Sequence, residues 1–203
     1  MFITFEGVEG AGKTTQIQYL ADLIKESGQD VLITRQPGGS ELGSEIRNLI
    51  LNPEIKDKPS DLAEMFLYLA DRSHHVQTVI KPALEKGITV LCDRYIDSHI
   101  AYQGYARGFD IEKLVYLNAI ASDNLKPDIT FVFDLDPVIG LNRVRFSRNQ
   151  AVLDRIEGEK IEFHQKVRNG FLSIAKEDPS RVVVIDASLS QEEVRKTIKS
   201  LIY

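Results

Sequence analysis

The sequence predicts an α/β protein, a doubly wound sheet of five parallel strands flanked by helices. Five short apolar runs alternate with longer segments of helical periodicity, and a glycine-rich phosphate-binding motif follows the first run. The runs are nearly continuous rather than alternating in polarity, which is typical of parallel strands covered on both faces. A chain of 203 residues has the length of one domain, so we expect residues 1–203 to fold as a single unit.

The five apolar runs are the predicted strands. Valine, isoleucine, leucine and phenylalanine dominate them, and such side chains pack well in a buried sheet. Because parallel strands need crossover connections, the segments between the runs are expected to hold helices. The predicted strands cover residues 2–6, 30–34, 88–92, 129–135 and 181–186.

Seven helices are predicted in the remaining segments. Pro82 is expected to kink or restart the longest of them. The last helix follows Ser190-Gln191-Glu192-Glu193, which fits a capping box. The predicted helices cover about 13–27, 43–51, 60–86, 111–124, 137–146, 160–177 and 190–202. In a sheet of this type, ligands bind at the carboxyl ends of the strands.

Residues 7–14, Gly-Val-Glu-Gly-Ala-Gly-Lys-Thr, fit the phosphate-binding pattern G-x-x-x-x-G-K-[ST] and are called the P-loop below. They lie between the first predicted strand and the first predicted helix, the context that the motif requires. Glycines let backbone N–H groups turn toward phosphate oxygens, and the helix N-terminus adds partial positive charge. Lys13 supplies a mobile charge and Thr14 a hydroxyl for Mg²⁺. The alternative is a glycine-rich turn that happens to precede a lysine.

All eight residues of this motif are predicted to bind a nucleoside triphosphate together with Mg²⁺. They are Gly7, Val8, Glu9, Gly10, Ala11, Gly12, Lys13 and Thr14.

Composition narrows the classes of protein that fit the chain. A net charge of −5 disfavours a general nucleic-acid binder. The single cysteine, Cys92, excludes an internal disulfide and favours a reducing compartment, so a cytoplasmic location is expected. No run approaches the length of a transmembrane span, and no signal peptide and no membrane association are expected.

Two polar segments follow the second and third predicted strands. Arg35 precedes Pro-Gly-Gly in the first of them and could bind an anion, or it could be a solvated arginine on a surface turn. Asp93 ends the third strand, where a carboxylate beside a P-loop would hold Mg²⁺. Arg94 follows it and fits a second phosphate; the alternative is an Asp–Arg surface pair.

Two later segments complete the predicted site. Residues 98–108 carry two tyrosines, an amide and an arginine, which suit a nucleoside pocket, although tyrosines at such spacing also occur in cores. Residues 143–157 carry Arg143, Arg145, Arg148 and Arg155. Arginines on a mobile loop, the lid at about 147–158, would close over ATP; a solvated basic helix face is the alternative for this segment. Residues 52–59 are a second expected mobile loop.

Together these segments resemble the thymidylate kinase family, whose members phosphorylate dTMP with ATP. The resemblance covers nearly the whole chain. Its most specific parts are Thr34-Arg35-x-Pro37-Gly38-Gly39, the run from Asp93-Arg94-Tyr95 to Tyr102-Gln103-Gly104, and Leu153-Asp154-Arg155-Ile156-Glu157. In one branch of the family the P-loop carries a catalytic arginine. Here Gly10 and Ala11 stand in its place, so the chain looks like the bacterial type, in which the lid donates arginines. The resemblance also implies a homodimer.

For the donor, the resemblance implies that Lys13 and Arg148 act on the β- and γ-phosphates of ATP, with Arg143 beside them. It implies that Thr14 and Asp93 hold Mg²⁺. The predicted catalytic residues are therefore Lys13, Asp93, Arg94 and Arg148.

For the acceptor, the resemblance implies that Arg35 and Arg94 hold the phosphate of dTMP. Arg72 would reach the thymine edge, and Glu9 would face the deoxyribose. Four further side chains are expected around the base and sugar: Tyr68, Ser98, Tyr102 and Gln103.

Three positions depart from the family pattern. Gln36 stands where glutamate is usual, His99 where a small residue is usual, and Tyr68 where phenylalanine usually stacks on thymine. A buried tyrosine hydroxyl needs a hydrogen-bond partner.

The predicted reaction is a direct in-line transfer from Mg·ATP to dTMP, without a phospho-enzyme. One alternative is a deoxynucleoside kinase or another nucleoside monophosphate kinase. A deoxynucleoside kinase needs a general base, for which Glu9 or Asp93 could serve. The other alternative is a regulatory P-loop NTPase, although the sequence has no Asn-Lys-x-Asp guanine-reading motif.

Overall fold

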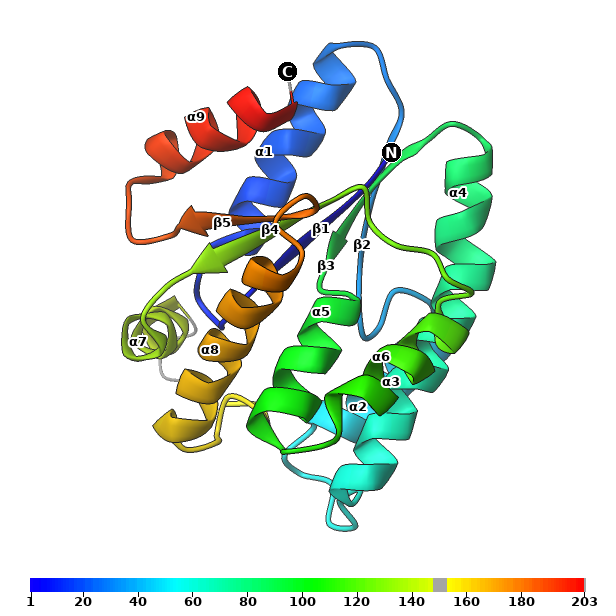
Figure 1. Ribbon diagram of the computed structural model, residues 1–203, viewed down its shortest axis with the longest axis vertical. Coiled ribbons are helices and arrows are strands. Elements are labelled where there is room, and N and C mark those ends of the chain that lie inside the picture. The colour runs from blue at the N-terminus through cyan, green and yellow to red at the C-terminus, as the bar shows by residue number, and fades with distance from the viewer. Residues whose placement is uncertain (148–152, 203) are drawn as a thin grey trace.

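A computed structural model describes residues 1–147 and 153–202 (Figure 1). Its centre is a sheet of five strands in the order β2-β3-β1-β4-β5, in which every neighbouring pair is parallel. The predicted fold class and all five predicted strands are confirmed. The strands are β1 (Phe2–Gly7), β2 (Val31–Arg35), β3 (Thr89–Asp93), β4 (Ile129–Asp134) and β5 (Val182–Asp186).

The strand order brings the polar strand ends together at one edge of the sheet. β1 lies in the centre, and its Phe5 is in register with Asp93 of β3. Asp93 is in register with Arg35 of β2 on its other side. The P-loop continues directly from β1. The P-loop, Asp93 and Arg35 therefore share the carboxyl edge at which the topology reverses, where doubly wound sheets bind ligands.

Helices cover both faces of this sheet (Figure 1). The helices α1 and α9 pack together on one face, while α8, α5 and the α3–α4 segment lie on the other. The α-helices are α1 (Lys13–Glu26), α2 (Glu41–Leu51), α3 (Asp61–His75), α4 (Lys81–Glu85), α5 (Ile96–His99), α6 (Ile111–Ala121), α7 (Pro137–Ser147), α8 (Ile161–Glu177) and α9 (Gln191–Ile202). Two π-helical segments, η1 (Val76–Ile80) and η2 (Ile100–Ala106), follow α3 and α5.

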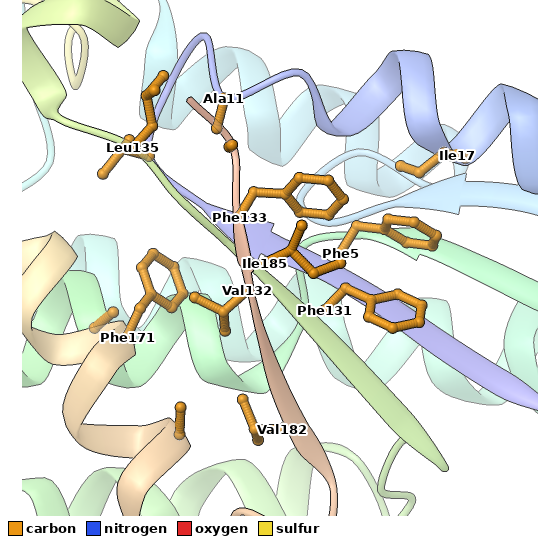
Figure 2. Packing of buried hydrophobic residues seen from close by; sticks show 14 of the residues in the cluster. Phe5, Ala11, Ile17, Phe131, Val132, Phe133, Leu135, Phe171, Val182 and Ile185 are labelled. Carbon is orange, nitrogen blue, oxygen red and sulfur yellow. The ribbon is translucent and has the colours of Figure 1, made fainter. Parts of the chain in front are cut away.

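Aromatic side chains fill the core on the α1 side of the sheet. The ring centroids of Phe131 and Phe133 lie 5.7 and 6.0 Å from that of Phe5. Figure 2 shows these three rings on one side of the strands and Phe171 of α8 on the other. Because side chains alternate along a strand, consecutive apolar residues serve both cores, which explains the continuous runs in the sequence.

The two outer strands are less covered than the sequence suggests. Ile33 of β2 is 41% exposed and Val184 of β5 is 44% exposed. The expectation that all five strands are covered on both faces is therefore wrong for β2 and β5. Each forms an edge of the sheet, so helices that pack over the central strands leave part of its surface open.

Most predicted helices agree with the structure, and the 60–86 segment restarts at its proline. α3 passes into η1, and α4 then begins with Pro82 in its first turn, where the missing N–H is tolerated. The predicted capping box is present: the Ser190 hydroxyl accepts from the Glu193 N–H at 3.3 Å, and the Ser190 N–H donates to the Glu193 carboxylate at 3.0 Å.

One helical segment is not predicted from the sequence. Residues 96–106 form α5 and η2 without interruption, whereas the sequence predicts only a nucleoside-pocket segment at 98–108. η2 packs closely on α8 and α6, and a Cβ at Gly104 would lie 3.1 Å from Ile111. Tertiary packing thus selects a helix that the glycine disfavours locally. Among the described residues, no helix is long and apolar enough to cross a membrane.

Candidate active site

The P-loop packs against helix α7 so closely that glycine is required. Gly10 has φ of 70°, and a Cβ there would lie 2.1 Å from the Gly140 carbonyl oxygen. Gly12 caps α1 in the left-handed conformation, with φ of 87°. Side chains other than glycine adopt such angles rarely, so the glycines set the shape of the loop.

Lys13 is buried, and its side chain forms hydrogen bonds with the backbone of the P-loop itself. Its Nζ donates to the carbonyl oxygens of Gly7 at 3.0 Å and Val8 at 2.9 Å. Burial, followed by the positive charge of Arg94, lowers the pKa of the ammonium, while Glu9 acts in the opposite direction. An anion bound in the loop would compete with the two carbonyl groups for this ammonium.

Glu9 and Arg94 form an ion pair beside the P-loop. Arg94 donates to Glu9 Oε1 at 2.6 Å and to the Gly7 carbonyl oxygen at 2.9 Å. The Tyr102 hydroxyl also donates to Glu9 Oε1, at 3.1 Å. Burial alone would raise the pKa of Glu9, but Arg94 and Lys13 outweigh it and hold the pKa at about 2. The carboxylate is therefore ionised at neutral pH.

A cavity of about 590 Å³ opens over the P-loop, and we call it the phosphate cavity. Its wall includes Glu9–Thr15 together with Arg35, Asp93, Arg94 and Arg143. Arg143 lies close to the loop, 3.5 Å from the Gly10 carbonyl oxygen. Arg35 is exposed at the rim. Arg148 lies outside the described residues.

The residues at the end of β3 suit a magnesium ion. Asp93 Oδ1 is buried and has no hydrogen-bond partner among the described residues, and Thr14 lines the same cavity. Carboxylate and hydroxyl oxygens are hard ligands of the kind that Mg²⁺ prefers. Within residues 1–147 and 153–202, no group of three or more His, Cys, Asp or Glu side chains could form a complete metal site. Such an ion would therefore also need oxygen ligands from phosphate and water.

A second, more enclosed cavity, the inner pocket, adjoins the phosphate cavity. Residues from the P-loop, the β2–α2 connection, α2, α3, α5, η2 and the C-terminal part of the predicted lid line it. Seven predicted site residues meet there: Glu9, Tyr68, Arg72, Arg94, Ser98, Tyr102 and Gln103. Glu9 and Arg94 line both cavities, so they mark the junction between them.

Arg72 is fixed in the wall of the inner pocket by acceptors from three parts of the chain. Its Nε donates to Gln36 Oε1 at 3.0 Å, and its two terminal nitrogens donate to Asn118 Oδ1 at 2.5 Å and the Tyr95 carbonyl oxygen at 3.0 Å. The side chain is 2% exposed. The guanidinium is therefore rigid, and its orientation does not depend on a ligand.

Gln36, one of the departures from the family pattern, links Arg72 to His75. Because Arg72 donates to Oε1, the amide nitrogen faces His75 Nδ1, at 3.0 Å. His75 Nε2 lies 2.7 Å from the Thr34 hydroxyl. Burial and the charge of Arg72 lower the pKa of His75 to about 4. A neutral amide thus joins a guanidinium to a neutral imidazole.

Arg155, in the C-terminal part of the predicted lid, is anchored away from the P-loop. The Arg155 side chain pairs with buried Glu64 of α3 and donates to the Ile50 carbonyl oxygen at 2.7 Å. Gln103 also donates to Glu64, at 2.7 Å. The expectation that Arg155 closes over ATP is therefore wrong in this structure, because a buried carboxylate 91 positions away in the sequence pairs with it.

Sequence reasoning missed three polar residues that support the site. Glu64, Asn118 and His75 hold Gln103, Arg72 and Gln36 respectively. Each lies in a helical segment that shows only ordinary amphipathic spacing. Their one available signal was a polar residue on an otherwise apolar helix face, which does not identify its partner.

Comparisons with known proteins agree with this geometry. The family model described as thymidylate kinase matches residues 5–198. A thymidylate kinase from Trichodesmium erythraeum is 46% identical, covering 99% of this chain and 94% of the relative. One from Desulfosudis oleivorans is 49% identical, covering 92% of this chain and 89% of the relative. A crystal structure of thymidylate kinase from Ehrlichia chaffeensis has a TM-score of 0.78 and 36% identity, covering 100% of this chain and 98% of that one. The chain therefore belongs to the thymidylate kinase family.

Proposed function

We propose that this protein transfers the γ-phosphoryl group of ATP to dTMP, giving ADP and dTDP for dTTP synthesis. The observation that carries the proposal is the position of Arg94 at the junction between the phosphate cavity and the inner pocket. Arg94 borders both the phosphate cavity and the inner pocket, and its guanidinium is held there by Glu9, Gly7 and Ser98. A cation at this point would hold a monophosphate in line with the terminal phosphate of ATP.

The acceptor oxygen of dTMP is ionised at neutral pH, so the reaction needs positioning and charge neutralisation rather than a strong base. In the proposed arrangement, Lys13 contacts the β- and γ-phosphates and Arg143 lies beside them. Arg35 and Arg94 hold the phosphate of dTMP. Thr14 and Asp93 hold Mg²⁺, which neutralises charge on the transferring phosphoryl group when bound.

We assign to Arg148 of the lid a further positive charge that neutralises the transferring phosphoryl group. The P-loop has no arginine, and Arg155 is committed to Glu64. A lid arginine would reach the transferring group only when the lid closes over ATP, which couples closure to chemistry.

The inner pocket is proposed to hold the nucleoside. Tyr68 and Tyr102 offer ring faces or edges, and Arg72 offers hydrogen bonds to the base. Glu9 and Gln103 lie at the sugar end, and Ser98 orients Arg94 from 3.2 Å. We expect residues 1–203 to work as one cytoplasmic nucleoside monophosphate kinase unit.

We also propose a homodimer formed through α3 and α6. These helices pack on each other, and both present large apolar side chains to solvent. The set is called the α3–α6 patch: Leu62, Phe66, Val115, Tyr116 and Ile120. Exposed apolar residues gathered on paired helices are typical of an interface with a second copy.

A deoxynucleoside kinase fits this geometry less well. Such an enzyme needs a general base near its acceptor hydroxyl, with a pKa near the working pH. Arg94 and Lys13 hold the pKa of Glu9 at about 2, which makes this carboxylate a weak base. Glu9 is better suited to hold Arg94 than to remove a proton.

The test is an ADP-release assay with ATP, Mg²⁺ and a panel of acceptors: dTMP, dUMP, UMP, CMP and thymidine. We expect dTMP to give the highest kcat/KM and thymidine to give no turnover. Faster turnover of thymidine than of dTMP would establish a deoxynucleoside kinase instead. ATP hydrolysis at the same rate with and without every acceptor would indicate a regulatory NTPase.

A further inference from the structure

Glu64 is a buried carboxylate that the proposed reaction does not use. It lies in the first turn of α3 and is fully buried. Its Oε1 accepts a hydrogen bond from Gln103 of η2 at 2.7 Å, and its Oε2 pairs with Arg155. Burying a carboxylate is costly unless partners of this kind surround it. The places of these two partners in the fold therefore show what Glu64 holds.

The first partner, Gln103, forms part of the wall of the inner pocket. Its side chain is 1% exposed and lines that pocket. A carboxylate oxygen only accepts hydrogen bonds, so the amide nitrogen of Gln103 faces Glu64 and the amide oxygen faces the other way. Glu64 thereby fixes the orientation of this amide in the pocket wall.

The second partner, Arg155, belongs to a turn that also lines the inner pocket. We call residues 154–157 the pocket turn. Arg155 pairs with the buried carboxylate, whereas the other three residues of the turn line the pocket. Asp154 closes the turn, because its Oδ1 accepts from the N–H groups of Ile156 at 2.9 Å and Glu157 at 2.8 Å. The conformation of the turn thus sets the shape of this part of the pocket.

Arg155 fastens the pocket turn to two helices. Its backbone N–H donates to the Leu51 carbonyl oxygen at 3.0 Å, and its Nε donates to the Ile50 carbonyl oxygen at 2.7 Å, both at the end of α2. Its terminal nitrogen pairs with Glu64 of α3. The side chain is 13% exposed. Removing the carboxylate would leave a largely buried cation without its partner and would loosen the turn.

Other charges near Glu64 do not replace Arg155. Arg107 lies on the same side, with its Nε 3.8 Å from Glu64. However, its Nη2 pairs with Glu159 at 2.7 Å, and its Nε also lies 3.7 Å from the exposed Asp61. Arg107 is therefore shared among three carboxylates, and Glu64 depends chiefly on Arg155.

We propose that Glu64 is a positioning residue for the acceptor nucleotide. It holds Gln103 directly and the pocket turn through Arg155, so two parts of the inner-pocket wall keep one arrangement before a ligand arrives. A preformed wall lowers the ordering cost of binding. The phosphate cavity meets these elements only at Glu157, so ATP binding should depend on Glu64 much less. This inference rests on the proposed function, because it assumes that dTMP occupies the inner pocket.

Steady-state kinetics tests this by measuring the KM for dTMP and the KM for ATP separately. Glu64→Gln keeps the shape and an acceptor for Gln103 but removes the charge that pairs with Arg155. We expect it to raise the KM for dTMP by about 10- to 100-fold, and to change kcat and the KM for ATP by less than about 3-fold. Asp61→Asn makes the same charge change at an exposed position of α3 and should alter each value by less than about 2-fold.

An unchanged KM for dTMP in Glu64→Gln would overturn the inference. Equal rises in the KM for dTMP and for ATP would also overturn it, as would the same rise in Asp61→Asn. Arg155→Met and the double variant with Glu64→Gln test the pairing itself. We expect the double variant to raise the KM for dTMP no more than Glu64→Gln alone, whereas multiplied effects would contradict the pairing. The double variant leaves neither member of the pair as an unpaired buried charge, which covers the case in which Glu64→Gln alone does not fold.

Amide hydrogen exchange tests the preformed wall on the wild-type protein without catalysis. In the absence of nucleotide, we expect the N–H groups of Arg155 and Glu157 to exchange at least about 10-fold more slowly than in an unstructured chain. Exchange at the unstructured rate would overturn the inference. A wild-type protein that shows this protection but does not phosphorylate dTMP would refute the proposed function instead, so the two failures are distinguishable.

Discussion

Glu6 lies beneath the site as a fully buried carboxylic acid. It accepts hydrogen bonds from the Tyr95 backbone N–H at 2.7 Å and from the Ser98 hydroxyl. Ser98 in turn accepts from Arg94. Burial, followed by the negative charge of Asp97, raises the pKa of Glu6 to about 7. The support for Arg94 therefore includes a group that changes charge near neutral pH.

The raised pKa of Glu6 makes its contribution to stability pH-dependent. The folded state binds the proton more tightly than the unfolded state, so the favourable contribution is complete below about pH 4.5 and is lost as pH rises through about 7. A shift from 4.5 to about 7 corresponds to roughly 3 kcal/mol. Relative to the wild type, Glu6→Gln should therefore gain up to about 3 kcal/mol in free energy of unfolding between pH 4.5 and 7.5.

Urea unfolding of both proteins at pH 4.5, 5.5, 6.5 and 7.5 checks this. His75 and His99, whose pKa values are lowered by burial, lose stability toward low pH in both proteins, so they cancel from the difference. A difference that stays constant with pH would contradict the expectation.

Arg148 carries the prediction most specific to the proposed mechanism. If it neutralises charge on the transferring phosphoryl group, Arg148→Ala should lower kcat by about 10²-fold or more, with a smaller change in the KM for dTMP. Steady-state kinetics with saturating Mg·ATP measures both. Lys166→Ala, which removes a positive charge from an exposed position of α8 outside both cavities, is the control. Wild-type turnover in Arg148→Ala would refute the lid-donor role.

Single residues also show how far sequence reasoning reaches. The P-loop residues, Asp93 and Arg94 were predictable because a local motif and a strand end determine where they lie. The Arg72–Asn118 and Arg155–Glu64 contacts were not, because they join residues 46 and 91 positions apart in the sequence. Nothing in the local sequence distinguishes a solvated arginine from one that a distant helix holds.

At the scale of elements, the contact between the P-loop and α7 is unusually close. A Cβ at Gly140 would lie 2.1 Å from the Glu9 carbonyl oxygen, and a Cβ at Gly10 would meet the Gly140 carbonyl oxygen at the same distance. α7 leads into the lid. The helix that carries the lid is therefore packed on the phosphate-binding loop by its backbone.

Gly140→Ala tests this contact. Replacing glycine by alanine usually raises the free energy of unfolding in a helix, whereas here we expect it to fall. Alanine in a helix is normally more stable than glycine by up to about 1 kcal/mol. Here the added methyl group should push α7 from the P-loop, lowering the free energy of unfolding by about 1–3 kcal/mol and raising the KM for ATP. Urea unfolding and ATP kinetics measure the two effects.

Asn142→Ala, at an exposed position of the same helix, is the control and should change neither quantity appreciably. An increase in stability for Gly140→Ala would show that α7 and the P-loop separate without cost.

Elements were predicted best where their pattern is strong. All five strands and the capped α9 follow from apolar runs and a capping box. α5 and η2 were missed because their stability comes from packing on α8 and α6, which no window of sequence contains.

At the scale of the whole molecule, the α3–α6 patch predicts the oligomeric state. Ile120 is 60% exposed and Tyr116 is 67% exposed, on a helix that packs against α3. If two copies meet through this patch, Ile120→Asp should bury a charge and convert the dimer to a monomer. Sedimentation velocity at several protein concentrations measures the result.

Leu201→Asp introduces the same charge at an exposed leucine of α9, outside the patch, and should leave the dimer intact. A wild-type protein that sediments as a monomer at all concentrations would contradict the dimer, and dimeric Ile120→Asp would place the interface elsewhere. Periodicity in the sequence could not make this distinction, because core and interface residues of α6 share one apolar pattern.

The two hydrogen bonds from Lys13 to the P-loop carbonyl groups have a consequence for ligand choice. The loop holds its own cation, so an arriving anion has to displace two charge-assisted hydrogen bonds, each worth about 1.5–3 kcal/mol. A triphosphate can contact the whole loop at once and so compensates for this loss better than a single phosphate ion does. We therefore expect the loop to bind polyphosphates more tightly than it binds free phosphate.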